Sequence, residues 1–365
     1  MANSEYVLVM VPEPASQEDT PEPNDTSDGF PQGELFTWHG TALIFIPLMM
    51  LLGISGNLLV YYIYHFRWRK NVVTLFKKML AILDLCNMLL ALPPLLYLTI
   101  NPYDDSFLTL CDFTSFIALG TAIASGGVLV IIAVDRYMKL RLLRKTGVGS
   151  MLSKQLFAVS IITACIINIP TMWIFGRDTI QLRFYNVSVS YCFIRKESYS
   201  SGMFLGWVAV LTIVFFSITV ALVYLYWCVV RKLQDLSDKH DELKRQPSVG
   251  VVKESLVKQK QSEIMRQSCI VFIAVTVVFF ATYMPYFITL IISMFSPDIL
   301  EGMSPYHKAY YDLAKLCPLL SAISNPFIYS FTSKQFRKEV SRLFTCQNRS
   351  RNTIDKAYQL PQVSE

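Results

Sequence analysis

Long apolar runs alternate with short polar segments along most of this 365-residue chain. Six runs contain no Asp, Glu, Lys or Arg, and a seventh, Met79–Ile100, contains Asp84 alone. A helix of roughly 20 mostly apolar residues crosses the hydrocarbon core of a bilayer with its backbone hydrogen bonds satisfied internally. The pattern therefore predicts an all-α membrane protein, a bundle of seven transmembrane helices within residues 40–333. The spans are expected at about residues 41–66, 74–100, 108–140, 153–175, 199–231, 264–296 and 307–332.

Only 16% of the residues are charged, against about a quarter in soluble domains, and their placement predicts the orientation. Residues 1–39 hold eight acidic residues and no Lys or Arg, whereas most of the 33 basic residues follow the first, third and fifth spans or the seventh. Lys and Arg accumulate on the cytoplasmic side of membranes. We therefore expect a multi-pass plasma-membrane protein with an extracellular N-terminus, in which residues 1–39 form a disordered tail. The net charge of +6 then reflects orientation and not nucleic-acid binding.

Several residues outside the spans are candidates for covalent modification. Two N-glycosylation sequons, at Asn24 and Asn186, fall on the side assigned to the exterior, although sequons are also common by chance. Cys111 and Cys192 are the cysteines expected in the oxidising compartment. They are either free thiols or a disulfide that ties the loop before the fifth span to the start of the third.

The segment after the seventh span predicts a short amphipathic eighth helix at residues 334–346. One helix face gathers the apolar residues of this basic segment, Phe336, Val340, Leu343 and Phe344. Such a helix lies against the lipid of the inner leaflet. Cys346, which is followed by a cytoplasmic tail at 347–365, is either a palmitoylation site or a free cytosolic thiol.

Placing a polar or charged group inside the membrane costs free energy, so such residues within the spans are candidate functional residues. Asp84 is the only ionisable residue expected deep in any span, and four residues with hydroxyl or amide groups are predicted at similar depth: Asn57, Ser125, Ser321 and Asn325. Either Asp84 is protonated and hydrogen-bonded to neighbouring helices, or it is ionised and ringed by oxygens that suit a monovalent cation.

A set of individually weak motifs occurs in a fixed order: Gly56-Asn57, Leu83-Asp84, Cys111, Asp135-Arg136-Tyr137, Pro170, Pro285 and Asn325-Pro326-x-x-Tyr329. Each alone has an ordinary explanation, such as a snorkelling anchor or a proline break. Together with seven spans, they resemble the rhodopsin-like (class A) G-protein-coupled receptors from Thr41 to about Cys346. The chain as a whole is similar to the neuropeptide-receptor branch of that family.

The resemblance implies a role for each matched residue. It implies a switch at the G-protein face, formed by Asp135, Arg136, Tyr137 and Tyr329. It implies hinges at Phe279, Tyr283, Pro285 and Pro326. It also implies an allosteric sodium site formed by Asp84, Ser125, Ser321 and Asn325, where the ion favours the inactive state. No other metal and no cofactor is expected.

Some positions depart from the family pattern. Tyr283 stands where the family has a toggle tryptophan, Ser160 replaces another tryptophan, and the fifth span lacks proline. Met265 occupies a position that is often acidic. Without that acid, Arg136 is expected to pair only with Asp135, which predicts measurable basal signalling.

The ligand is constrained by what the chain lacks. Ala118 replaces the aspartate of aminergic receptors and Leu319 replaces the retinal lysine of opsins, which leaves a peptide or a lipid. The long loop from about Arg177 to Tyr199 favours a peptide. Four residues are predicted to bind it: Arg195, Lys196, Lys315 and Tyr283. The positive charge of Arg195, Lys196 and Lys315 either attracts an anionic group of the ligand or is ordinary solvated charge.

The predicted function is that of a cell-surface receptor that binds an extracellular ligand, expected to be a peptide, and activates heterotrimeric G proteins. The alternatives are an atypical, non-signalling receptor and, more remotely, a transporter, although the chain shows no internal repeat. An enzyme is not expected, because the four histidines lie at span ends or in loops without metal-ligand spacing: His39, His65, His240 and His307.

Overall fold

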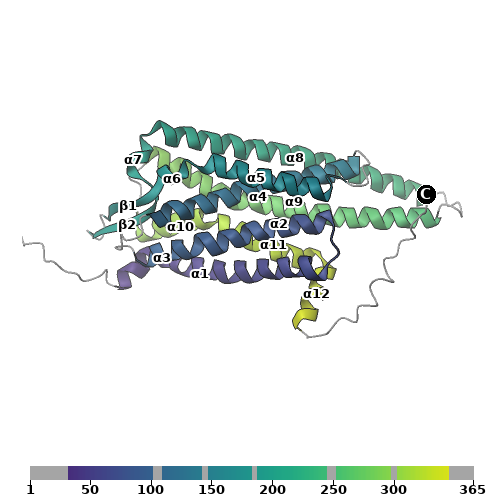
Figure 1. The fold of residues 1–365 in the computed structure, drawn as a ribbon, viewed down its shortest axis with the longest axis horizontal. Helices are drawn as coiled ribbons and strands as arrows, with labels where there is room; N and C mark the ends of the chain where they lie inside the picture. Colours follow the sequence, from purple (N-terminus) through teal and green to yellow (C-terminus); the bar gives the residue numbers. More distant parts are fainter. Residues whose placement is uncertain are drawn as a thin grey trace, which may run out of the picture.

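The computed structural model describes residues 32–101, 109–141, 147–182, 187–244, 252–296 and 302–344. Its helices run side by side along one long axis, with a two-stranded hairpin at one end of the bundle and α12 (Lys334–Phe344) near the other (Figure 1). We call these the hairpin end and the opposite end. Asn24, Asn186, Cys346 and the tail at 347–365 lie outside the described residues, so their predicted roles stay predictions.

Seven spans form the bundle in the described part of the chain, as predicted. Six helical stretches are long and apolar enough to cross a membrane. They are built from α1 (Gln32–Tyr62), α2 (Val72–Cys86) with α3 (Leu92–Ile100), α4 (Thr109–Arg141), α5 (Ser150–Asn168) with α6 (Thr171–Ile174), α8 (Gly202–Lys244) and α9 (Val252–Phe295). π-helical turns at Ile63–Arg67 and Asn87–Ala91 continue α1 and join α2 to α3. The seventh span consists of α10 (Pro305–Leu316) followed directly by α11 (Pro318–Thr332).

Local sequence explains where several of these helices begin. At α2, the Asn71 side chain accepts a hydrogen bond from the Thr74 amide at 2.8 Å, and the Thr74 hydroxyl accepts one from the Asn71 amide at 3.0 Å. This reciprocal cap satisfies two otherwise orphaned donors. At α10, Ser304 caps the first turn and Pro305 occupies the first helical position. Pro318 has no amide hydrogen to continue the ladder, so α11 begins there as a separate helix.

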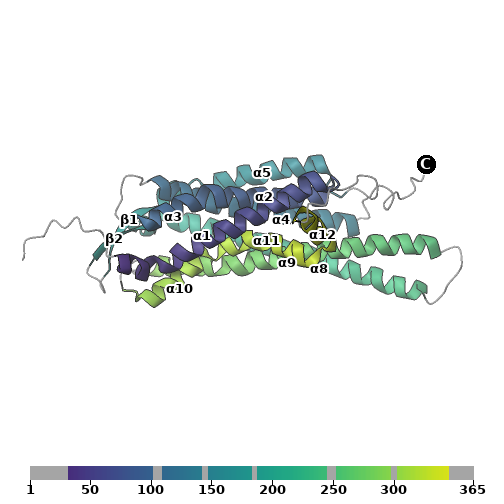
Figure 2. The same cartoon turned by 90° about the horizontal axis from the view of Figure 1, so that it is seen from below.

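Two helices extend further than the apolar runs indicate. α8 continues to Lys244 and α9 begins at Val252, so much of the segment between the fifth and sixth spans is helical. Figure 2 shows these two helices projecting together beyond the opposite end of the bundle. Residues 252–266 are rich in Lys, Glu and Gln, which favour helix in water as well as in lipid. α1 likewise begins at Gln32, inside the segment predicted as a disordered tail.

The hairpin consists of β1 (Phe175–Leu182) and the antiparallel β2 (Val187–Ile194), followed by the single turn α7 (Lys196–Tyr199). Phe175 pairs with Ile194 at the base. A disulfide between Cys111 and Cys192 ties β2 to the first turn of α4. The predicted disulfide is therefore confirmed, and the hairpin lies over one end of the helices (Figure 1).

The helices pack through small residues on the inside and expose apolar residues on the outside. α1 approaches α11 so closely at Gly56 that an added Cβ would lie 2.8 Å from Cγ of Pro326. On the outer faces, Leu51 and Ile213 are 68% and 65% exposed. Such extensive apolar surface is a liability in water but suits a lipid environment.

Candidate functional site

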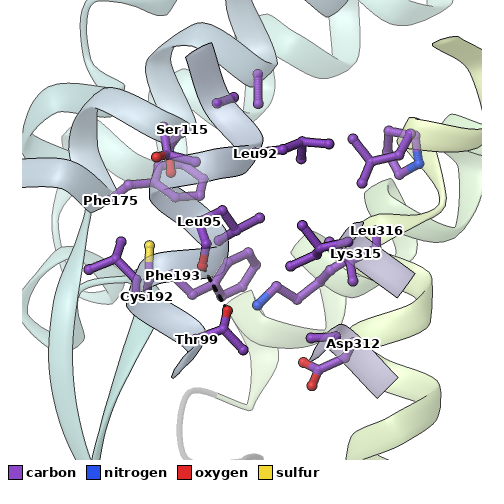
Figure 3. Close-up of a pocket in the computed structure, with 18 of the residues that line it drawn as sticks. Leu92, Leu95, Thr99, Ser115, Phe175, Cys192, Phe193, Asp312, Lys315 and Leu316 are labelled. Atoms are coloured by element: carbon purple, nitrogen blue, oxygen red, sulfur yellow. Dashed lines mark hydrogen bonds between the residues drawn. The ribbon is translucent and has the colours of Figure 1, made fainter. Parts of the chain in front are cut away.

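A cavity of about 160 Å³ opens beneath the hairpin. Its walls are mostly apolar, with leucines from α3, aromatic residues from the hairpin and polar residues from α10 (Figure 3). A mostly apolar pocket with a few convergent polar groups is the usual form of a small-molecule or peptide-anchor site. The labelled lining residues include Leu92, Leu95, Ser115, Phe193, Asp312 and Lys315.

The polar wall of this cavity belongs to α10. Lys308 forms an ion pair with Asp312 one helical turn later, and both residues are buried. A pair at this spacing lies on one face of a helix, so the two charges largely neutralise each other within the wall. The expectation that Asp84 would be the only ionisable residue deep in a span therefore fails at the seventh span.

Lys315 lies on the same helix and points into the cavity toward the hairpin (Figure 3). Its ammonium donates a hydrogen bond to the hydroxyl of Tyr191. The ammonium nitrogen is 4.1 Å from the ring centroid of Tyr191 and 4.2 Å from that of Phe193. Aromatic faces attract cations at this range. Lys315 and Tyr283, both predicted to bind ligand, therefore line the cavity.

The other two predicted ligand contacts do not line the cavity. Arg195 donates to both carboxylate oxygens of Asp112, at 2.9 and 3.1 Å. Lys196 is exposed, and its backbone amide donates to Asp178 at 2.5 Å. The Arg195 side chain and the Lys196 backbone amide thus both hold the hairpin in place. Sequence reasoning missed Asp112, although its position directly after Cys111 places it near whatever the disulfide ties down.

The residues predicted to bind sodium come together midway along the bundle. The Asn325 amide donates to the Asp84 carboxylate at 2.8 Å. A small second cavity is lined by this pair and by Ser125 and Ser321. The carbonyl oxygen of the Asn325 side chain is buried and accepts no hydrogen bond from the described residues. Carboxylate, hydroxyl and amide oxygens are suitable ligands for a hard cation, so the residues fit the ion, whose binding stays a prediction.

Two aromatic residues of α9 close this cavity on the side of the hairpin. Phe279 and Tyr283 line it, and their ring centroids are 4.5 Å apart. Pro285 lies two residues after Tyr283 in α9, and Pro326 lies within α11. Each proline removes a backbone donor and weakens its helix locally, which is the property that a hinge requires.

At the opposite end, Asp135 and Arg136 lie buried on α4. Arg136 forms an ion pair with Asp135 at 3.2 Å, and its guanidinium carbon is 5.5 Å from the ring centroid of Phe272 on α9. Asp135 also pairs with Lys139 at 3.0 Å and accepts a hydrogen bond from the Val148 amide at 3.1 Å. The neighbouring Tyr137 is partly buried against Leu140 and Val229.

Tyr329 on α11 is fully buried beside an unexpected lysine. Lys77 donates to the Tyr64 hydroxyl at 2.9 Å, and its ammonium nitrogen is 4.8 Å from the ring centroid of Tyr329. Phe336 of α12 stacks on Tyr64 with ring centroids 5.7 Å apart. Sequence reasoning missed Lys77, because basic residues at the end of a span usually snorkel to the interface. Its spacing of seven residues from Asp84 places it on the same helix face, and this signal could have revealed it.

The whole bundle matches one known family. Residues 56–329 match the family described as 7 transmembrane receptor (rhodopsin family). Because the match covers most of the chain, the protein belongs to this family of signalling receptors and is not an enzyme. It is a multi-pass membrane protein of the rhodopsin-like, class A type of G-protein-coupled receptor.

Particular relatives match over shorter or more distant ranges. Over 102 residues, the chain is 34% identical to chemerin-like receptor 2 of Mus musculus and 33% identical to those of Rattus norvegicus and Homo sapiens. Each match spans 28% of this chain and 29% of the relative. The crystal structure of squid rhodopsin superposes with a TM-score of 0.70 at 18% identity, covering 92% of this chain and 94% of that one. This last similarity supports the fold.

Proposed function

We propose that this receptor lies in the plasma membrane with the hairpin end outside the cell, binds an extracellular peptide in the cavity and activates heterotrimeric G proteins at the opposite end. The observation that carries the proposal is one continuous bundle with a covered cavity beneath the hairpin and the buried Asp135–Arg136 pair at the other end. A shift of helices within such a bundle links the two ends.

The proposed orientation is supported by the distribution of basic residues, which gather after the first, third, fifth and seventh spans. An epitope tag at the N-terminus should bind antibody on intact cells, and a tag after Glu365 should bind only after permeabilisation. Detection of both tags on intact cells, or of neither, would contradict the proposed topology.

A peptide is favoured over other ligands by three features. Ala118 provides no counter-ion for an amine, and Leu319 provides no amine for retinal. The hairpin of β1 and β2 lines the cavity with Phe175, Tyr191 and Phe193. Main-chain pairing along a strand is one way in which extended peptides are recognised.

The function is tested by expressing the receptor with a panel of G-protein sensors and applying a peptide library. We expect at least one peptide to give a saturable response that Arg136→Ala abolishes at equal surface expression. Uptake of labelled peptide with every sensor silent would favour the non-signalling alternative. Family membership gives the transporter alternative no support.

A further inference from the structure

The cavity beneath the hairpin carries an unbalanced positive charge. Among the described residues, three with charged side chains line it: Lys308, Asp312 and Lys315. His39 also lines it and is counted here as neutral. Lys308 and Asp312 form an ion pair. Lys315 forms no ion pair with a carboxylate in the described part of the chain. An ammonium withdrawn from bulk water favours an anionic partner.

The neighbours of Lys315 compensate its charge only in part. An ammonium has three hydrogen-bond donors, and among the described residues one is used by the Tyr191 hydroxyl. The other close neighbours are the aromatic faces of Tyr191 and Phe193. The Asp312 carboxylate also attracts this ammonium, but it is shared with Lys308, to which it is paired directly. The aromatic faces leave the positive charge uncancelled, and the remaining donors have room in the cavity.

The surroundings of this ammonium are apolar. Leucines of α3 line the cavity beside it (Figure 3). A third cavity, of about 50 Å³, borders the cavity beneath the hairpin, and the two share Leu119, Tyr283 and Tyr286 as walls. It extends between α4, α8 and α9 and is lined by apolar and aromatic residues such as Phe215 and Phe287. A ligand held at Lys315 therefore meets space for a bulky apolar group.

We propose that Lys315 binds the free terminal carboxylate of a peptide whose last residue is large and apolar. The proposal rests on the proposed function in taking the cavity as the peptide site. A peptide entering by its N-terminal ammonium would need an available carboxylate. Asp312 is already paired with Lys308, and Asp112 with Arg195, so these two carboxylates of the described residues are committed.

The test uses two small probes with the purified full-length receptor in lipid nanodiscs. N-acetyl-L-phenylalanine carries the carboxylate and the aromatic group, and N-acetyl-L-phenylalaninamide lacks only the charge. Fragments of this size bind with Kd values on the order of 1 mM, so saturation-transfer NMR is suitable. We expect the acid to bind at least about tenfold more tightly than the amide, as hydrogen bonds to charged groups generally provide.

Variants at one position assign this selectivity to Lys315. Lys315→Gln should reduce the affinity for the acid to that of the amide, and Lys315→Arg should largely restore it. Lys196→Gln is the matched control, because it removes one lysine at the same end of the bundle from an exposed position. Should Lys315→Gln fail to fold, the comparison of acid with amide on the wild-type receptor still decides.

Three results would overturn the proposal: equal binding of acid and amide, binding insensitive to Lys315→Gln, or binding of neither probe. Decanoate is the third probe, and tighter binding of decanoate than of N-acetyl-L-phenylalanine would assign the site to a fatty acid instead. No G protein is present in this assay. Carboxylate selectivity combined with silent sensors in the peptide screen would therefore reject the signalling function alone.

Discussion

Lys77, Lys308 and Lys315 each lie in a mostly apolar setting, but their surroundings differ. Lys308 pairs with a carboxylate, whereas Lys77 and Lys315 each donate to a tyrosine hydroxyl and lie over aromatic rings. Lys315 also lines the cavity beneath the hairpin, and Lys77 lines none of the cavities described above. The desolvation cost of an ammonium is the same in kind at all three positions. A lysine that lacks a carboxylate partner and lines a cavity is therefore the one that is available for a ligand.

Lys77→Met is expected to raise basal signalling about fivefold. The change removes the hydrogen bond to Tyr64 and the cation beside Tyr329, and their loss is worth about 1 kcal/mol. Tyr329 is then held less firmly in its buried position. The measurement is the ligand-independent sensor signal at matched surface expression.

The control for this prediction is Lys78→Met, which makes the same change at the adjacent, partly exposed residue. It should leave the basal signal near that of the wild type. An unchanged or lower signal from Lys77→Met would show that Lys77 does not restrain Tyr329.

Asp84→Asn is expected to abolish any stabilisation of the receptor by sodium. At a sodium concentration about tenfold above Kd, binding to the folded state adds about 1.4 kcal/mol to the free energy of unfolding. Thermal unfolding in sodium chloride should therefore occur at a higher temperature than in choline chloride of equal ionic strength, but only with Asp84 present. Equal sodium shifts in wild type and variant would contradict the predicted site.

At the scale of elements, the hairpin is attached to the bundle by more than its disulfide. Arg195 pairs with Asp112 on α4, and Arg177 donates to the backbone oxygen of Asn101 after α3 at 2.6 Å. Gly176 lies against the Arg195 side chain, so that an added Cβ would be 2.0 Å from Nε. The hairpin is thereby fixed over the cavity from several sides.

Arg195→Gln is expected to lower the free energy of unfolding by about 1–2 kcal/mol, because it leaves the buried Asp112 carboxylate without its ion pair. Adding Asp112→Asn should cost less than the sum of the two single changes. Chemical or thermal unfolding of the four receptors in the cycle measures this coupling. Strictly additive effects would mean that the pair contributes nothing to attachment.

Sequence patterns predicted the seven spans because lipid imposes length and apolarity on each. They could not predict how far α8 and α9 continue into water, since beyond the apolar run only weak helix propensity operates. Asp84, Ser125, Ser321 and Asn325, which the family resemblance grouped as a sodium site, line one cavity, and ion binding there stays a prediction. The pairing of Arg195 with Asp112 could not be predicted, because it is set by the tertiary position of the hairpin.

At the scale of the whole molecule, the resting state depends on how firmly Arg136 is held at the opposite end. Its ion pair comes from Asp135 on its own helix, and the sequence has Met265 where the family resemblance leads us to expect an acid. A thioether cannot form an ion pair. Residue 265 therefore supplies no carboxylate to Arg136, and we expect a resting state that is held less firmly.

We expect cells expressing the wild-type receptor to give a ligand-independent G-protein signal above that of mock-transfected cells. Met265→Glu should lower this signal by supplying a carboxylate from α9 that can pair with Arg136. Sensor output normalised to surface expression measures both effects. A wild-type signal equal to mock would show that the resting bundle is held by other contacts.

Tyr283 lines the outer cavity, the apolar cavity beside it and the polar cavity around Asp84. This one side chain cannot move away from all three cavities at once, so a ligand that displaces it from one cavity pushes it toward another. Sodium held next to Asp84 should therefore weaken peptide binding above. By thermodynamic reciprocity, bound peptide should lower the affinity for sodium by the same factor. The apparent affinity for peptide should therefore fall as the sodium concentration rises.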